Sequence, residues 1–226
     1  MEPITKFLAH STDLSRRAAE EMVRAKKVRI NGKVAPLGAT VDPAKDRVEY
    51  GGKIIAARTM GATTVALYKP VGTVTTKGEA EKEAHTVMDL LPKELQHLKP
   101  VGRLDKESEG LLLLTDDGDL LYRLTHPKFE TEKEYLVEFA DNVPDAMIAR
   151  WKKGVKLPEG MAKADRVERK SRKSLVVVIH QGLNRQLRRM AGQSGASITK
   201  LVRTRSGDVK LGTLKPGAWR RVSVPE

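Results

Sequence analysis

Apolar residues recur at helical spacing near the start of the chain and at strand spacing soon after it. Following Ser15, a good helix N-cap, they return at intervals of three and four residues, which predicts a short amphipathic helix. Val28 and Ile30 then alternate with polar residues and lead into Asn31-Gly32, a strong hairpin signal. Residues 1–59 are therefore expected to form a small module of two short helices and a hairpin.

The remainder of the chain, residues 63–226, carries longer apolar segments of both kinds. Residues 111–114 are four consecutive leucines, as expected for a central strand covered on both faces. The pattern predicts further strands at 64–69, 132–139, 174–182, 197–207 and 219–224, and helices at 85–91, 116–126, 144–155 and 184–195. Because strands and helices mix without a regular β-α-β rhythm, an α+β fold is favoured over a doubly wound one. Residues around Gly61 are expected to link the two parts.

Charge adds information about partners. The chain has 42 Lys and Arg against 29 Asp and Glu, a formal net charge of +13. Between Leu183 and Arg221, ten basic residues face a single acidic one, Asp208. A merely soluble basic protein does not require such a cluster, so the clustering indicates a polyanionic partner, with nucleic acid first among the candidates.

Composition removes several other classes of function. The chain has no cysteine, which excludes a disulfide framework and a zinc ribbon. Its five histidines lack metal-site spacings, and no glycine-rich phosphate-binding motif occurs. Nothing reads as a signal peptide or a membrane span, so we expect a cytoplasmic protein without a membrane partner. Aromatic residues, at 4%, are too few for rows of stacked bases on a sheet.

Asp105 is the first candidate for chemistry. It lies in a loop that leads into the four-leucine strand, between glycines at 102 and 110. On residue type alone, a surface ion pair with Arg103 or Lys106 explains it. Its position also suits a nucleophile or a base, because a rigid buried strand fixes the loop and glycines permit close approach of a substrate.

The basic segment 184–190, NRQLRRM, is the second candidate. Arg185, Arg188 and Arg189 lie three and four residues apart at the start of the expected helix, which Asn184 would cap. They form a solvated basic face, or else they turn one guanidinium inward to hold a carboxylate while the others meet phosphates. Asp105 is the obvious carboxylate for such a pair.

Several segments together resemble a known enzyme family. GRLDKESEGLLLLTDDG at 102–118 resembles the signature of the pseudouridine synthases that act on bacterial ribosomal RNA, of the RsuA and RluB type. YKPVGTVTT, KEYLV, NRQLRRM and LVRTRSGDVKLGTLKPGAWR resemble the family's other motifs in the same order. Residues 4–34 are similar to an S4 RNA-binding module. The resemblance implies a catalytic domain with a mixed, largely antiparallel central sheet flanked by helices.

The resemblance also implies the isomerisation of a uridine in RNA to pseudouridine, without a cofactor. Asp105 would initiate the reaction as nucleophile or base, and Arg188 would pair with it. The family's basic motif usually begins with Gly-Arg or Gly-Lys, whereas here Leu183 follows the glycine, which leaves Arg185 as an alternative partner of Asp105. Tyr135 would stack on the target base, although its place in a strand also fits ordinary packing.

Further residues are expected to hold the substrate or to contact RNA. Those expected to hold the substrate are Arg103, Leu201, Arg185 and Lys69. Those expected to contact RNA elsewhere are Arg16, Arg17, Lys26, Lys27, Arg189, Arg203 and Arg205.

The expected substrate is ribosomal RNA or a pre-ribosomal particle, with the large subunit slightly favoured, and the expected state is a monomer. The main alternative is a non-catalytic RNA-binding or ribosome-assembly factor, because S4 modules and high positive charge also occur in such proteins. An RNA hydrolase that uses Asp105 has less support, since no metal cluster or catalytic histidine accompanies it.

Overall fold

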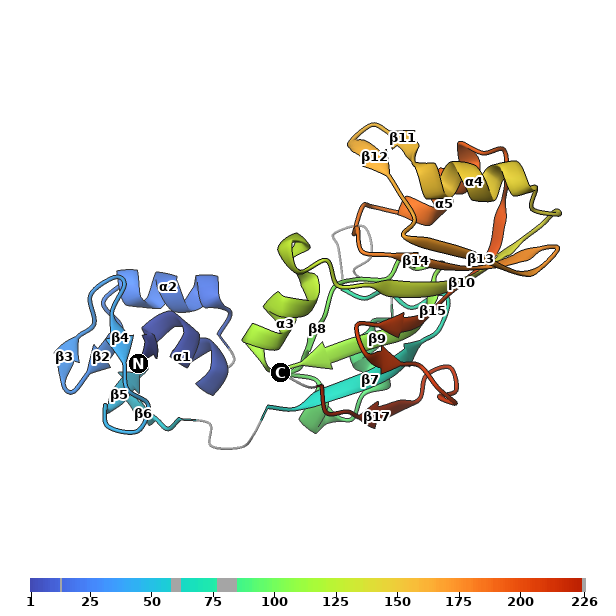
Figure 1. Ribbon diagram of the computed structural model, residues 1–226. Helices are drawn as coiled ribbons and strands as arrows, with labels where there is room; N and C mark the ends of the chain where they lie inside the picture. The colour runs from blue at the N-terminus through green and yellow to red at the C-terminus, as the bar shows by residue number, and fades with distance from the viewer. Residues whose placement is uncertain (13, 58–61, 77–84, 225–226) are drawn as a thin grey trace. The chain divides into compact units, whose positions relative to one another are not determined.

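The computed structural model describes residues 1–226 except 13, 58–61, 77–84 and 225–226 (Figure 1). The chain divides into two compact units, Met1–Gly61 and Ala62–Glu226, which are described separately below. The linker expected around Gly61 lies largely outside the described residues. Within the described ranges, no helix combines the length and the apolar character that crossing a membrane requires.

The N-terminal unit packs two helices against short strands. Its helices are α1 (Ile4–Ser11) and α2 (Arg16–Arg24), and its main sheet has the strand order β3-β2-β5-β6. The strands are β1 (Glu2–Pro3), β2 (Val28–Ile30), β3 (Lys33–Val34), β4 (Thr40–Val41), β5 (Val48–Tyr50) and β6 (Lys53–Ile55). Phe7, Leu8, Val23 and Val48 are buried together, so this unit has a hydrophobic core of its own.

Local sequence signals explain the N-cap of α2 and the hairpin between β2 and β3. The Ser15 hydroxyl accepts a hydrogen bond of 3.1 Å from the Ala18 N–H and so caps α2. Asn31 and Gly32 have φ angles of 51° and 80°, the left-handed pair that a two-residue turn between β2 and β3 requires. The capped helix and the hairpin predicted from the sequence are both confirmed.

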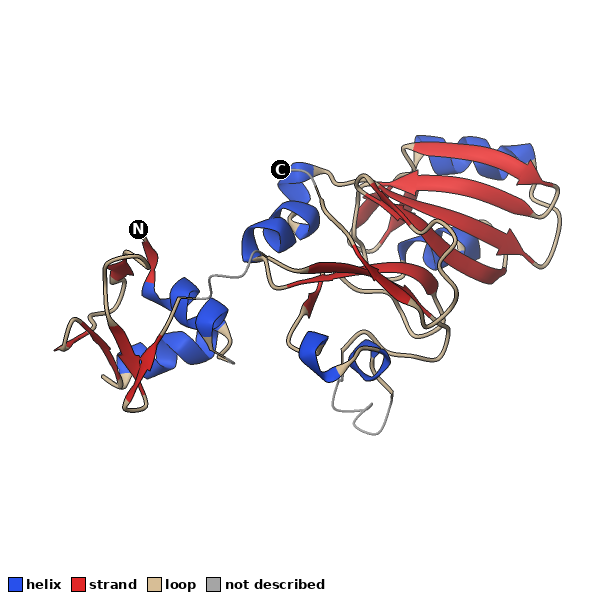
Figure 2. Ribbon diagram, turned by 90° about the horizontal axis from the view of Figure 1, so that it is seen from below, coloured by secondary structure: helices blue, strands red, loops and turns tan. Residues whose placement is uncertain are grey.

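The C-terminal unit is built on a nine-stranded sheet, drawn in red in Figure 2. The strand order is β13-β14-β10-β15-β9-β7-β17, with β16 beside β15 and β8 beside β9. The strands of this sheet are β7 (Thr64–Lys69), β8 (Lys99–Pro100), β9 (Glu109–Thr115), β10 (Lys133–Phe139), β13 (Arg166–Ser171), β14 (Ser174–Ile179), β15 (Ile198–Ser206), β16 (Val209–Lys210) and β17 (Trp219–Arg221). Only the β9–β15 pair is parallel among the described strands, which confirms the expected α+β class with a mixed, largely antiparallel sheet.

Helices, 3-10 turns and one small hairpin complete this unit. They are α3 (Gly118–Thr125), α4 (Asp145–Lys153), α5 (Gln186–Gly192), η2 (Val87–Leu90), η3 (Lys93–Leu95), η4 (Pro127–Phe129) and the hairpin β11 (Val155–Leu157) with β12 (Gly160–Ala162). Trp151 of α4 and Met190 of α5 are fully buried in one core with residues of the sheet. The helix expected at 85–91 is only the turn η2, because Pro92 follows at once and cannot continue a helix.

Strand β9 is buried on both faces, as its four leucines predicted. Residues 111–114 are each at most 1% exposed. Leu112 and Leu114 belong to the core that contains α4 and α5, whereas Leu111 and Leu113 belong to a second core. Strand β9 pairs with β7 over six residues but with β15 through only two residue pairs. The loop before β9 is therefore anchored at the point where the two halves of the sheet meet.

Candidate active site

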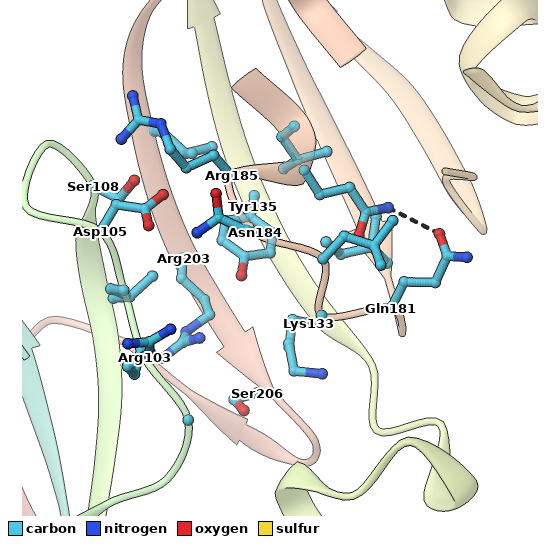
Figure 3. A pocket seen from close by; sticks show the side chains of 18 of the residues that line it. Arg103, Asp105, Ser108, Lys133, Tyr135, Gln181, Asn184, Arg185, Arg203 and Ser206 are labelled. Atoms are coloured by element: carbon cyan, nitrogen blue, oxygen red, sulfur yellow. Dashed lines mark hydrogen bonds between the residues drawn. The ribbon is translucent and has the colours of Figure 1, made fainter. Parts of the chain in front are cut away.

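A cavity of about 310 Å³ lies where the loop before β9 meets strands β10 and β15 (Figure 3). Asp105 comes from the loop, Tyr135 from β10, and Leu201 from β15. Residues 181–187, which lead into α5 and include its first two residues, form another wall. Segments far apart in the sequence thus meet in one pocket. It brings together five of the residues expected to act on or hold a substrate: Asp105, Tyr135, Leu201, Arg103 and Arg185.

The Asp105 loop is held from one side by Lys69 of β7. Lys69 is fully buried, and its ammonium donates hydrogen bonds of 3.0, 3.5 and 2.7 Å to the backbone carbonyls of Pro70, Lys106 and Ser108. Burial lowers the pKa of Lys69 to about 8. Lys69 was expected to bind substrate, but it does not line the cavity, because its donors are used to fix the loop.

The loop is also held by Thr75 and by two arginines of the basic segment. The Thr75 hydroxyl donates to the Leu104 carbonyl at 2.8 Å and accepts from the Leu104 N–H at 3.1 Å. Arg188 donates a hydrogen bond of 2.8 Å to the Glu107 carbonyl, and Arg185 forms an ion pair of 2.6 Å with the Glu107 carboxylate. The backbone on both sides of the candidate catalytic residue is therefore fixed by side chains from three separate segments.

The Asp105 carboxylate itself makes no hydrogen bond or ion pair with any residue of the described ranges. It is half-buried and lines the cavity, and in Figure 3 it points into the space that Tyr135 also faces. Lys69, Arg185 and Arg188 are close enough to interact with it electrostatically. The loop thus presents a hydrogen-bond acceptor that has cations nearby but no direct contact with any of them.

The direct pair between Asp105 and Arg188 expected from the sequence is not found, and Arg185 does not form it either. Helix α5 begins at Gln186, and Arg185 occupies its N-cap position with a φ of 46°, so the expected Asn184 cap is also wrong. Arg188 binds the loop backbone at Glu107 and does not line the cavity. Burial and then Arg185 lower the pKa of Arg188, and its Nε is buried without a partner among the described residues.

Tyr135, Leu201 and Arg203 share one face of the sheet. Tyr135 lies opposite Arg203 in the register of β10 and β15, and Val137 lies opposite Leu201. Alternate residues of a strand point to the same face, so the register places these side chains together on the cavity side. Tyr135 is 8% exposed and Leu201 is 6% exposed, and both line the cavity. They give it an aromatic and an aliphatic surface.

Gly110 brings β9 and β15 together at this point. Its φ is 105°, and a Cβ at this position would lie 2.6 Å from Arg203 N and closer still to Arg203 O. Only a glycine permits this contact between two backbones. The glycine that the sequence suggested for substrate approach therefore serves the packing of the strand that carries Leu201 and Arg203.

Three arginines expected to contact RNA are engaged within the protein. Arg203 is 3% exposed and lines the cavity, where its Nε donates to the Leu111 carbonyl at 2.6 Å. Arg189 binds both carboxylate oxygens of Glu159. Arg205 binds the carboxylate of Glu132 at 2.7 Å and a backbone carbonyl. Arg203 could therefore meet RNA only from inside the cavity, and the other two would have to exchange an existing partner for RNA.

The remaining basic residues are accessible. Arg103 is exposed and lines the cavity. The residues of the N-terminal unit expected to contact RNA, Arg16, Arg17, Lys26 and Lys27, are all exposed. They are accessible to a polyanion, in contrast to Arg203, which is buried.

Lys133 and Ser206 are among the polar residues of the cavity that sequence reasoning missed. A signal for Lys133 was present, because it precedes Tyr135 by two residues in a strand and must share its face. Ser206 ends β15, three residues after Arg203, and only the pairing of β10 with β15 brings it near Lys133.

Comparisons with known proteins agree with this architecture. Residues 63–193 match the RNA pseudouridylate synthase family, and residues 3–48 match the S4 domain. The chain is 35% identical to an uncharacterised RNA pseudouridine synthase of Aquifex aeolicus over 99% of this chain and 91% of that protein. It is 34% identical to ribosomal large subunit pseudouridine synthase B of Bacillus subtilis over 100% of this chain and 94% of that protein. A crystal structure of a pseudouridylate synthase superposes with a TM-score of 0.70, at 28% identity, over 99% of this chain and 96% of the other. The chain therefore belongs to the RNA pseudouridylate synthase family and carries an N-terminal S4 domain.

Proposed function

We propose that this protein isomerises one specific uridine of ribosomal RNA to pseudouridine and that Asp105 initiates the reaction. The observation that carries the proposal is the Asp105 carboxylate, which is held rigidly, faces the cavity and has no partner among the described residues. A carboxylate that served only to stabilise the loop would be expected to bond to it. Here the surrounding backbone is bonded and the carboxylate is left for a ligand.

The reaction needs no external group. The C1′–N1 bond of the uridine breaks, the uracil turns, C5 bonds to C1′, and the hydrogen of C5 is lost while N1 gains one. Atoms and electrons balance within the nucleotide and water. Asp105 can start this sequence as a nucleophile or as a base, because it faces the cavity as an acceptor.

The other walls of the cavity suit a uracil. Tyr135 offers a ring for stacking, and its hydroxyl points into the cavity in Figure 3. Leu201 lies on the same face of the sheet and adds an aliphatic surface beside the ring. Because the cavity is formed by at least four segments of chain, a uridine within folded RNA must leave its stack to enter.

Ribosomal RNA is the proposed substrate on two grounds. Relatives that align with the whole chain include enzymes named for the large ribosomal subunit, which favours that subunit here. The exposed cations of the N-terminal unit, Arg16, Arg17, Lys26 and Lys27, supply an RNA-binding surface outside the cavity. A non-catalytic assembly factor would use the same surface, but RNA binding alone would not need the unpaired Asp105 carboxylate in the cavity.

The test uses the full-length protein and ribosomal RNA labelled with tritium at uridine C5. Release of tritium reports the loss of the C5 hydrogen, and primer extension after carbodiimide treatment maps the modified position. We expect wild type to release tritium at one position and Asp105→Asn to release none, with RNA affinity unchanged.

Lys106→Gln is the matched control, because Lys106 is the exposed neighbour of Asp105. It should keep full activity. Tritium release by Asp105→Asn at the wild-type rate would refute the catalytic role, and RNA binding without any modification by wild type would favour the assembly factor instead.

A further inference from the structure

One end of the cavity concentrates positive charge. Arg103, Lys133 and Arg203 all line the cavity, and Figure 3 shows their head groups toward the end where Ser206 lies, whereas Asp105 and Arg185 lie toward the other end. Asp105 is the only acidic residue in the described lining. This end therefore has cations without an acidic side chain among them.

Arg203 is the most buried of these cations. It is 3% exposed, and its Nε donates to the Leu111 carbonyl. Its two terminal nitrogens make no hydrogen bond with the described residues, although they belong to a side chain that lines the cavity. A guanidinium removed from bulk water with donors left over is costly unless an acceptor reaches it.

Lys133 stands beside it on the neighbouring strand. Its ammonium donates to the carbonyls of Thr131 at 2.9 Å and His180 at 3.2 Å, which leaves the third N–H of the group for another acceptor. Burial and then the charge of Arg203 lower the pKa of Lys133. The adjacent carboxylate, that of Glu134, is bonded to Arg166 and Thr204 instead.

Ser206 adds a neutral donor. It is 5% exposed and lines the same end of the cavity, and its hydroxyl makes no hydrogen bond with the described residues. Two cations and a hydroxyl with spare donors, and no nearby carboxylate to compensate them, are complementary to a small oxyanion. A uracil carbonyl could accept one of these bonds, but a neutral base would leave both charges uncompensated.

We infer that Arg203, Lys133 and Ser206 form a phosphate subsite inside the cavity, which takes a phosphodiester group flanking the target uridine. The inference rests on the proposed function, because it places the base against Tyr135 and Leu201 and the ribose near Asp105. A nucleotide that leaves its helix carries its phosphates with it. The subsite holds one of them and thereby fixes the sugar relative to the carboxylate.

The test combines protein variants with a short RNA that contains the target uridine. One RNA carries an uncharged methylphosphonate on the 5′ side of that uridine, a second carries it on the 3′ side, and a third is unmodified. For wild type, we expect kcat/KM to fall by about tenfold to hundredfold on one of the two methylphosphonate RNAs, which identifies the phosphate that is bound.

Lys133→Met should have a kcat/KM on the unmodified RNA that is lower than that of wild type by a similar factor. Its kcat/KM on that methylphosphonate RNA should be no lower than on the unmodified RNA. Lys133→Arg should retain the sensitivity to the methylphosphonate, and its thermal unfolding, measured alongside that of Lys133→Met, checks that both variants fold. Lys170→Met removes an equal charge from an exposed position on β13 and should match wild type.

The inference is overturned if wild type has the same kcat/KM on both methylphosphonate RNAs as on the unmodified RNA. It is also overturned if the methylphosphonate lowers the kcat/KM of Lys133→Met by the same factor as that of wild type. In either case, reaction of wild type with the unmodified RNA would leave the proposed function in place. Failure of wild type to modify any RNA would instead refute the proposed function.

Discussion

Arg188 donates a hydrogen bond of 2.8 Å to the backbone carbonyl of Glu107, two residues after Asp105. The basic segment therefore acts on the candidate catalytic carboxylate through the backbone of its loop. Lys69 and Thr75 bind the same loop at other atoms. Together they leave the carboxylate exposed to the cavity in a fixed position, which is the condition that a nucleophile or a base requires.

Arg188→Met should lower kcat by about a hundredfold and change KM little, because a loop displaced by an ångström misplaces Asp105 without altering the base-binding walls. Steady-state kinetics on an RNA that contains the target uridine measure kcat and KM. Glu107→Gln is the control: it removes the exposed ion pair with Arg185 but keeps the carbonyl that Arg188 binds, so activity should stay within about fivefold of wild type. Equal losses in the two variants would contradict the role assigned to the carbonyl.

Lys69→Met should destabilise the C-terminal unit by about 2–4 kcal/mol, because three backbone carbonyls lose their donor. The effect should also depend on pH. The pKa of Lys69 is lowered to about 8 by burial, so between that value and its ordinary pKa the unfolded chain binds more protons than the folded one. Wild-type stability relative to Lys69→Met should therefore rise as the pH increases from about 8 to about 10. Urea unfolding of both proteins across this pH range measures the difference in their free energies of unfolding. A difference that falls as the pH rises would contradict the prediction.

Gly110→Ala should destabilise the protein by about 3–5 kcal/mol, from a left-handed φ of 105° and from overlap with the Arg203 backbone. Gly102→Ala is a matched comparison, because Gly102 also has a positive φ, 72°, but a Cβ there would meet nothing nearer than 4.0 Å. It should cost only about 1 kcal/mol. Thermal unfolding of the two variants separates backbone strain from steric overlap, and similar losses would argue against the close contact between β9 and β15.

Arg16→Ala with Arg17→Ala should weaken RNA binding and reduce the slope of log K against log salt concentration by about 1.5, if each cation meets one phosphate. Fluorescence anisotropy at several salt concentrations measures the slope. The control is Arg24→Ala with Arg47→Ala, which removes the same charge from residues already paired with Glu20 and Glu49. An equal change of slope in both variants would show that net charge, and not the position of these two arginines, governs binding.

Most secondary structure was predictable from local patterns. The boundaries of β7 match the expected strand, the caps and turns around Ser15 and Asn31 form as their residue types require, and β9 is buried on both faces. Strands β11, β12 and β13 are among those missed, because β11 and β12 have only three residues each, β13 has a single apolar residue, and all three depend on pairing with neighbours. The α5 cap was misplaced, because Arg185 adopts a left-handed conformation that no residue-type preference indicates.

The sequence by itself determined most of the longer elements, the α+β class, the clustering of charge and the identity of Asp105 and Tyr135 as candidates, since these depend on residue type, periodicity and motif order. Only the tertiary structure decided what each cation binds. Arg188 and Lys69 bind the loop backbone, and Arg203 and Lys133 line the cavity with spare donors. Local sequence cannot specify these roles, because a long cationic side chain has many rotamers of similar energy, and the selection among them is made by acceptors that only long-range strand pairing brings within reach.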